Sequence, residues 1–326
     1  SESGKISYSW SIAGSTGTLS LSSVSSDPRY FKLAAYTLSS DESYTITTTV
    51  TTPSGVSNTA HATTTVLMAS LEAVIDGGSE RSVQLSEGLK LDASVSVDNN
   101  NADGSIDGLN FVWTCLDITE NAECGFDDSL DNNPVITLSD SQLNPTVYRF
   151  SVMISDATRS SNASTLITVI QDSIPSVSVT STFSDGKVNP SGSIKLQGSL
   201  DLLYATGALS VWDLDEDASS SFGYSSELSG VALTQLEKSF SSSGTFTHYL
   251  VLDGSFLVNG GQYTFSFSSS YSGSQAFSFA KLTLMVNAPP TSGVVFVSPP
   301  SGYSIQDEFD LTATGWTDDV EDFPLT

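Results

Sequence analysis

The sequence LNFVWTC (residues 109–115) places Phe111 and Trp113 at alternate positions. A period of two predicts a β-strand that turns one face toward a core. The same alternation occurs upstream in LKLDASVSV (residues 89–97) and downstream in YRFSVMI (residues 148–154). Three such strands in one stretch predict a module built from β-sheet.

Related strands occur elsewhere in the chain at a similar spacing. Trp10 precedes Trp113 by 103 residues, and Tyr44 precedes Tyr148 by 104 residues. Two anchors with nearly the same offset indicate a repeat of about 100 residues. A third copy carries the equivalent positions at Trp212 and Tyr263.

Modules of about 100 residues with short alternating strands and one central tryptophan predict an all-β fold of tandem immunoglobulin-like or fibronectin-III-like β-sandwiches. No segment keeps a helical apolar period, so we expect little helix. Asn287-Ala288-Pro289-Pro290 marks the clearest boundary, because proline lacks the N–H that a sheet needs. The predicted units are a truncated module at 1–69, a complete module at 70–173, a complete module with an insertion at 174–287, and the opening strands of a further module at 288–326.

Charge and hydropathy exclude several classes of partner. The net charge is −26, which argues against nucleic acid and anionic membranes, since both attract clustered Lys and Arg. No apolar run approaches the roughly 20 residues that span a bilayer, so we expect no membrane contact from this segment. Residue 1 is Ser, and no leader pattern opens the sequence, so we expect that a signal peptide has been removed or lies upstream and that the chain is a piece of a longer protein.

Cysteine and sequon usage favour an extracellular location. Cys115 and Cys124 are the only two cysteines. They could be free thiols in a core, but a small β-domain in an oxidising compartment favours a disulfide between them. Asn162-Ala163-Ser164 is an N-glycosylation sequon that proline does not block. These features predict an extracellular or cell-surface glycoprotein.

The sharpest candidate site is an Asn/Asp-rich stretch at residues 99–107. Oxygen-bearing side chains at alternate positions, with Gly104 for a sharp turn, are similar to the start of a calcium loop. The alternative is that these residues collect here because the connection needs Asx-turns and positive φ. A site with so few carboxylates would be a weak one, and no other cofactor is expected. The possible calcium ligands are Asn99, Asn101, Asp103, Ser105 and Asp107.

Catalysis is not expected from this chain. Its two histidines, His61 and His248, lie in different modules in Thr-rich, strand-like surroundings, which favours solvent-facing positions on strands. The motifs of phosphate loops, nucleophile elbows and zinc proteases are absent from the sequence. We therefore predict that the protein is not an enzyme.

Several motifs together are similar to one family. They are Ala288-Pro289-Pro290-Thr291-Ser292-Gly293, Gly315-Trp316-Thr317-Asp318-Asp319, Leu91-Asp92-Ala93-Ser94, and Trp113-Thr114-Cys115 with Cys124 downstream. In this order they resemble the REJ module, named from receptors for egg jelly, and the related PKD repeats of polycystin-1-like ectodomains. The resemblance implies a secreted or cell-surface protein made of fibronectin-like sandwiches without catalytic residues. The third unit departs from the pattern, because it lacks the cysteine pair and the LDAS run.

Two functions follow as expectations. The first is a structural or adhesive glycoprotein whose modules form a stiff rod, assembled into a fibre or a cell-surface or flagellar appendage, with other copies of itself or surface proteins and glycans as partners. The alternative is the ligand-binding ectodomain of a polycystin-like or egg-jelly-type receptor. The receptor hypothesis predicts an exposed aromatic patch, for which Phe222, Tyr224 and Phe256 are the candidates.

Overall fold

The computed structural model of the chain describes residues 5–125, 132–181, 187–190, 192–204, 207–215, 228–303, 305 and 307–319. Within these ranges the regular elements are strands, and the only helical pieces are 3-10 turns of three residues each. The predicted all-β fold class is confirmed. No helix in the described part of the chain has the length and apolar character needed to cross a bilayer.

The first unit is a single four-stranded antiparallel sheet in the order β2-β1-β3-β4. Alternate residues of β1 and β3 form its apolar face, where Ile12 and Tyr44 are buried. Trp10 lies on the same face, stacks on Phe31 at 5.7 Å between ring centroids, and donates its indole N–H to the Pro28 carbonyl at 2.9 Å. The strands are β1 (Ser7–Gly14), β2 (Gly17–Leu19), β3 (Glu42–Thr51) and β4 (Ser57–Val66).

The second unit is a two-layered sandwich. One layer runs β10-β9-β12-β13, and strands β11 and β7 belong to the opposite layer. Its core buries Trp113, Phe150 and Val152 against Leu91. The strands are β5 (Leu71–Glu72), β6 (Glu80–Gln84), β7 (Leu89–Asp92), β8 (Val97–Asp98), β9 (Asn110–Asp117), β10 (Ala122–Glu123), β11 (Val135–Leu138), β12 (Val147–Ser155) and β13 (Ser160–Ile170).

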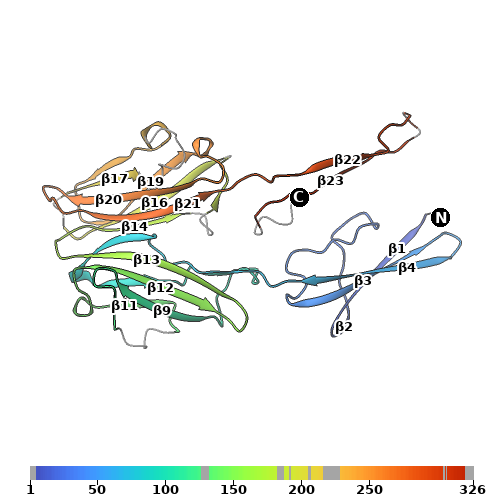
Figure 1. The fold of residues 1–326 in the computed structure, drawn as a ribbon, viewed down its shortest axis with the longest axis horizontal. Coiled ribbons are helices and arrows are strands. Elements are labelled where there is room, and N and C mark those ends of the chain that lie inside the picture. The colour runs from blue at the N-terminus through green and yellow to red at the C-terminus, as the bar shows by residue number, and fades with distance from the viewer. Residues whose placement is uncertain are drawn as a thin grey trace.

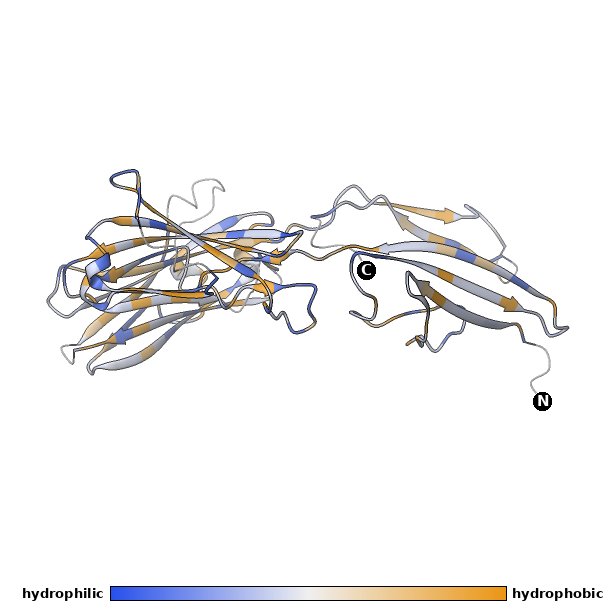
Figure 2. Cartoon of the chain, turned by 90° about the horizontal axis from the view of Figure 1, so that it is seen from below, coloured by the Kyte–Doolittle hydropathy of each residue, from blue (hydrophilic) through white to orange (hydrophobic). Residues whose placement is uncertain are grey.

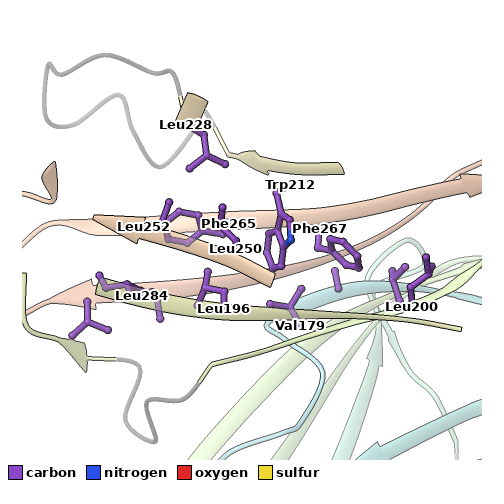
Figure 3. Packing of buried hydrophobic residues seen from close by; sticks show 14 of the residues in the cluster. Val179, Leu196, Leu200, Trp212, Leu228, Leu250, Leu252, Phe265, Phe267 and Leu284 are labelled. Carbon is purple, nitrogen blue, oxygen red and sulfur yellow. The ribbon is translucent and has the colours of Figure 1, made fainter. Parts of the chain in front are cut away.

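The third unit repeats this plan, with a layer β21-β20-β17-β18 facing a layer β14-β16-β19. Figure 3 shows Trp212, Phe265 and Phe267 from one layer packed against Val179 and Leu196 from the other. The strand order is that of an immunoglobulin-like or fibronectin-III-like sandwich. The strands are β14 (Ser176–Ser181), β15 (Lys187–Val188), β16 (Ser193–Leu202), β17 (Ala208–Leu214), β18 (Glu237–Phe240), β19 (Gly244–Asp253), β20 (Gln262–Tyr271) and β21 (Ser278–Val286).

All three units share one local device at the start of the late strand. A tyrosine hydroxyl accepts a hydrogen bond from a backbone N–H four or five residues upstream, as in the tyrosine corner of such sandwiches. The pairs are Ser39 N–H to Tyr44 at 2.9 Å, Asn144 N–H to Tyr148 at 2.9 Å, and Val258 N–H to Tyr263 at 3.0 Å. These tyrosines are the ones whose spacing indicated the repeat.

One short strand joins the second unit to the third. Strand β6 pairs in parallel with β13 of its own unit and antiparallel with β21 of the next unit. The two layers become one continuous sheet of ten strands, and Figure 1 shows the two sandwiches side by side. Figure 2 shows that hydrophobic and hydrophilic residues alternate along the strands.

Two glycines bring β6 to this position. Gly77 and Gly78 have φ of 99° and 105°, which L side chains rarely adopt. A Cβ on Gly78 would lie 2.4 Å from the Lys281 carbonyl oxygen of β21. That same oxygen accepts the Ser79 backbone N–H at 2.8 Å. The glycine therefore permits the close backbone approach at the seam between the two units.

Two further elements extend from the paired sandwiches. Residues 287–290 lead out of β21 into a hairpin of β22 (Val294–Ser298) and β23 (Asp310–Thr314), and all residues of these two strands are exposed. In Figure 1 this hairpin and the first unit lie toward the same end of the molecule. The chain thus folds back on itself, because its two complete sandwiches stand next to each other.

His248 departs from the expectation drawn from its surroundings. The expected solvent-facing position is wrong, because the residue is only 4% exposed. Its Nε2 donates to the Gln235 carbonyl at 2.8 Å, so the neutral ring accepts the Ser210 hydroxyl at Nδ1, also at 2.8 Å. Burial lowers the pKa of His248. His61, on β4, is exposed as expected.

From the close contact between Gly78 and β21 we predict that adding one methyl group at Gly78 destabilises the protein strongly. Gly78→Ala should lower the free energy of unfolding by about 1 to 3 kcal/mol more than Gly273→Ala does, because only Gly78 faces backbone atoms of the neighbouring unit. Gly273 also has a positive φ, at 83°, but has open space around it, so it reports the cost of backbone strain alone. Urea unfolding measures both variants. Equal losses would mean that β6 and β21 are not in close contact.

Acidification should destabilise the third unit through His248. Because the folded pKa lies below the unfolded value of about 6.5, the stabilisation is complete above that pH and is lost as the pH falls below it. The midpoint temperature of thermal unfolding of the wild type should therefore decrease as the pH is lowered from about 6.5 to about 5. His248→Gln should flatten this fall, while His61→Gln should leave it unchanged. A His248→Gln profile identical to that of the wild type would contradict the assignment.

Candidate functional site

The predicted calcium loop follows β8 and is organised by hydrogen bonds within itself. Asp103 Oδ1 accepts the Ser105 N–H at 3.0 Å, and Ser105 Oγ accepts the Asp107 N–H at 3.2 Å. Asn101 donates its amide to the Ser105 carbonyl at 2.7 Å. Asn99 has a distant contact of 3.5 Å from its amide to Ser70 Oγ. These are Asx-type turns, which were the alternative explanation for the composition.

Carboxylates do not gather around this loop. Within the described ranges no group of three or more His, Cys, Asp or Glu side chains is placed to hold a metal ion. Asp98, the nearest additional carboxylate, is bound by an arginine. Weak calcium binding by Asn99, Asn101, Asp103, Ser105 and Asp107 stays a prediction.

Arg159 is the centre of the junction between the first and second units. Its guanidinium binds both oxygens of Asp98, at 2.7 and 2.9 Å, and Asp156 Oδ2 at 2.6 and 2.8 Å. A further N–H binds the Ala69 carbonyl at 2.9 Å. A guanidinium has five N–H donors, and all five are used here. The side chains of Arg159 and Asp98 are only 15% and 9% exposed.

The connector between the units is held from both sides. Ala69 gives its carbonyl to Arg159 and donates its N–H to Asn100 Oδ1 at 2.7 Å. The hydrogen bond from Arg159 lowers the pKa of Asp98, and the backbone N–H groups of Thr158 and Arg159 lower the pKa of Asp156. Both carboxylates therefore stay ionised and paired at neutral pH. The first unit is oriented by side chains of the second.

A cleft of about 650 Å³ opens at this junction. The loop before β3 forms one wall, and the loop after β8 forms the other. Tyr36 stands at its edge, 61% exposed, with a φ of 58° that is unusual for a tyrosine. The lining residues are Tyr36, Thr37, Leu38, Ser39, Ser40, Val66, Leu67, Ala69, Asp98, Asn99, Asn100, Asn101 and Arg159.

A second cavity, of about 320 Å³, lies at the seam between the second and third units. Arg81 of β6 lines it and donates to the Lys90 carbonyl at 2.7 Å, while its Nε is buried without a hydrogen bond. Nearby, Lys281 of β21 bridges Glu80 at 3.1 Å and Asp215 at 2.9 Å. Burial alone would lower the pKa of Lys281, but the bonds to Asp215 and Glu80 outweigh it and raise the pKa. This cluster ties the units together by charge.

The modification sites lie on the second unit. Cys115 and Cys124 form a disulfide with 5.4 Å between their Cα atoms, and it closes the β9–β10 hairpin. Asn162 is exposed on β13, as is Ser164 of the same sequon. A glycan at Asn162 is therefore sterically possible, and its presence stays a prediction.

The proposed aromatic patch is only partly within the described structure. Phe256 is 59% exposed next to β19. Phe222 and Tyr224 lie outside the described residues. The sequence patterns did not point to Arg159 or Tyr36. Two features of the sequence could have indicated Arg159. Basic residues are scarce, 11 in the chain, and Arg159 lies three positions after Asp156.

Arg159→Ala should destabilise the protein, because it removes the partner of two carboxylates and the bond to the Ala69 carbonyl. We expect a loss of about 2 kcal/mol in the free energy of unfolding, as for hydrogen bonds to charged groups. Arg159→Lys should recover only part of it, since an ammonium cannot bind both oxygens of Asp98 in the same geometry. Chemical denaturation measures both. Wild-type stability in Arg159→Ala would contradict the junction described above.

Comparison with known proteins gives one family. A model of the REJ domain matches residues 1–326. A search of curated proteins found no match.

Solved structures with similar arrangements are distant. Drosophila N-cadherin EC1-3 has 12% identity and a TM-score of 0.31, with 86% of this chain and 89% of that chain covered. The FN1–FN3 domains of chicken CNTN1 have 11% identity and a TM-score of 0.26, with the same coverage of 86% and 89%. Salmonella alpha-2-macroglobulin reacted with methylamine has 11% identity and a TM-score of 0.27 over 91% of this chain, which spans only 22% of that protein.

Proposed function

The chain belongs to the REJ domain family, the ectodomain family of polycystin-1, and from that premise we propose that it is a non-catalytic structural or adhesive glycoprotein outside the cell. Its units form a stiff segment of a rod that assembles into a fibre or a cell-surface or flagellar appendage. Other copies of the chain, or surface proteins and glycans, are its partners. The REJ domain is an extracellular ectodomain family, which supports this location.

The observation that carries the proposal is the seam at β6. Backbone pairing of β6 with both β13 and β21 joins one layer of each sandwich into a single continuous sheet. Separating them requires breaking hydrogen bonds on one edge of β6 and the Glu80–Lys281–Asp215 cluster together. Flexible arrays of domains lack such a joint, because their interfaces are small and polar. A stiff joint suits a protein whose role is mechanical.

The second joint supports the same role. Arg159 and Asn100 bind both backbone polar groups of Ala69, so the connector into the first unit has little freedom. The ion pairs of Arg159 are largely shielded from solvent, and salt screens such pairs much less than exposed ones. A rod built from this segment is double-width where the two complete sandwiches lie side by side.

Absence of catalysis is part of the proposal. The two histidines lie in different units, and the ring of His248 is occupied by Ser210 and the Gln235 carbonyl in a core. A general base must reach a substrate proton, and a ring that is buried and already bonded at both nitrogens is poorly placed for this.

A ligand-binding ectodomain is the second candidate. The exposed ring of Phe256 and the junction cleft beside Tyr36 favour it. A receptor would use these surfaces without forming long assemblies, so the two candidates differ in what the isolated protein does.

Negative-stain electron microscopy of the protein from its native source tests the structural proposal. We expect continuous filaments or appendages. Adding a calcium chelator tests the 99–107 loop separately, since loss of the filaments would give that loop a role in assembly. Isolated particles at every protein concentration would overturn the structural proposal and favour the receptor.

A further inference from the structure

We propose that the cleft between the first and second units binds a neutral saccharide, with the ring of Tyr36 as its stacking platform. The cleft, of about 650 Å³, has the size of a site for a small ligand. The proposal does not depend on filament assembly, because every wall of the cleft belongs to one chain.

Charge excludes an anionic ligand. The only charged side chains that line the cleft are Asp98 and Arg159, and they neutralise each other. All five N–H groups of Arg159 already bind Asp98, Asp156 and the Ala69 carbonyl. No cationic donor in the cleft is left to recognise a carboxylate or a sulfate, and the net charge of −26 repels anions in general.

Asp98 is likewise not free to bind a cation in the cleft. Asp98 Oδ1 accepts from Arg159 and from the Asn100 N–H at 2.9 Å, and Oδ2 accepts from Arg159. The carboxylate is therefore satisfied by the protein itself. A ligand that carries no charge but many hydroxyl groups remains.

The polar groups that face the cleft suit hydroxyl groups. Ser39 and Ser40 have hydroxyls without a hydrogen bond to another described residue, and the amide of Asn99 has only the 3.5 Å contact to Ser70. Hydroxyl and amide side chains can each donate and accept hydrogen bonds. The hydroxyl groups of a sugar also do both, so the two sets of groups match. Leu38 and Leu67 supply apolar surface for the carbon skeleton.

Tyr36 supplies the aromatic surface. It is 61% exposed at the edge of the cleft, and its φ of 58° lies in the left-handed region that costs a non-glycine residue free energy. Strain of this kind persists where the surroundings demand it and gathers at binding sites. A ring held open beside a polar cleft can stack on the C–H face of a sugar while its hydroxyl stays in water.

Binding of neutral trisaccharides to the full chain tests the proposal. The probes are maltotriose, mannotriose and chitotriose, with a sulfated heparin oligosaccharide as the anionic comparison, and the readout is saturation-transfer NMR followed by titration. We expect at least one neutral trisaccharide to bind at millimolar concentration or below and the sulfated probe not to bind at the cleft.

Variants separate binding from folding. Tyr36→Gly should weaken binding by about tenfold or more while thermal stability is unchanged or higher, because glycine relieves the strained φ. Asn99→Ala should weaken it by a similar factor. Tyr30→Ala is the matched control, since Tyr30 is 63% exposed on the same unit but does not line the cleft.

Three results would overturn the proposal. They are no binding of any neutral trisaccharide, binding that Tyr36→Gly leaves intact, and binding of the sulfated probe that the cleft variants reduce. None of these results bears on filament formation, so failure of this proposal and failure of the structural role are distinguishable.

Discussion

Every strand at the edge of a sheet presents backbone N–H and C=O groups that need partners. In this protein all five residues of β6, Glu80–Gln84, pair with the edge of β13, and two of them, Glu80 and Arg81, also pair with the edge of β21. The arrangement covers the edge of β13 and part of the edge of β21, and it joins one layer of the second unit and one layer of the third into a single ten-stranded sheet. The course of the rest of the chain follows, because side-by-side units direct the first unit and the β22–β23 hairpin toward the same end of the molecule (Figure 1).

The joints use few charges, and each is placed where it is protected. The chain has 37 acidic and only 11 basic residues. Ion pairs that are exposed to solvent contribute little to the stability of a protein. Arg159 and Lys281 instead each bind two carboxylates from different parts of the fold. One fixes the connector at Ala69, and the other reinforces the seam. Rigid joints of this kind are consistent with the proposed mechanical role.

The sequence predicted the features that depend on local patterns. Alternation around Trp113 and Phe150 identified strands of the core, and the spacing of Tyr44, Tyr148 and Tyr263 identified positions that prove to be tyrosine corners. An alternation of apolar and polar residues can be recognised in the sequence alone, without knowing which strands pair with one another.

Features that depend on distant pairing were not predictable in the same way. Nothing in the sequence of β6 indicates that Glu80 and Arg81 pair with β21, about 200 positions away. His248 was expected to face solvent because its flanking residues are polar, yet its partners Ser210 and Gln235 come from other strands and loops and bury it. Arg159 was missed for the same reason, since Asp98 lies 61 positions upstream.

The central claim is that β6 makes two sandwiches into one cooperative unit, and native-state hydrogen exchange tests it most directly. The amides of β6 that pair with β13 or β21, and those of β21 opposite it, should exchange only through opening with the free energy of global unfolding. The second and third units should then show the same free energy of opening. Rapid exchange of β6, with different opening free energies for the two units, would contradict the claim.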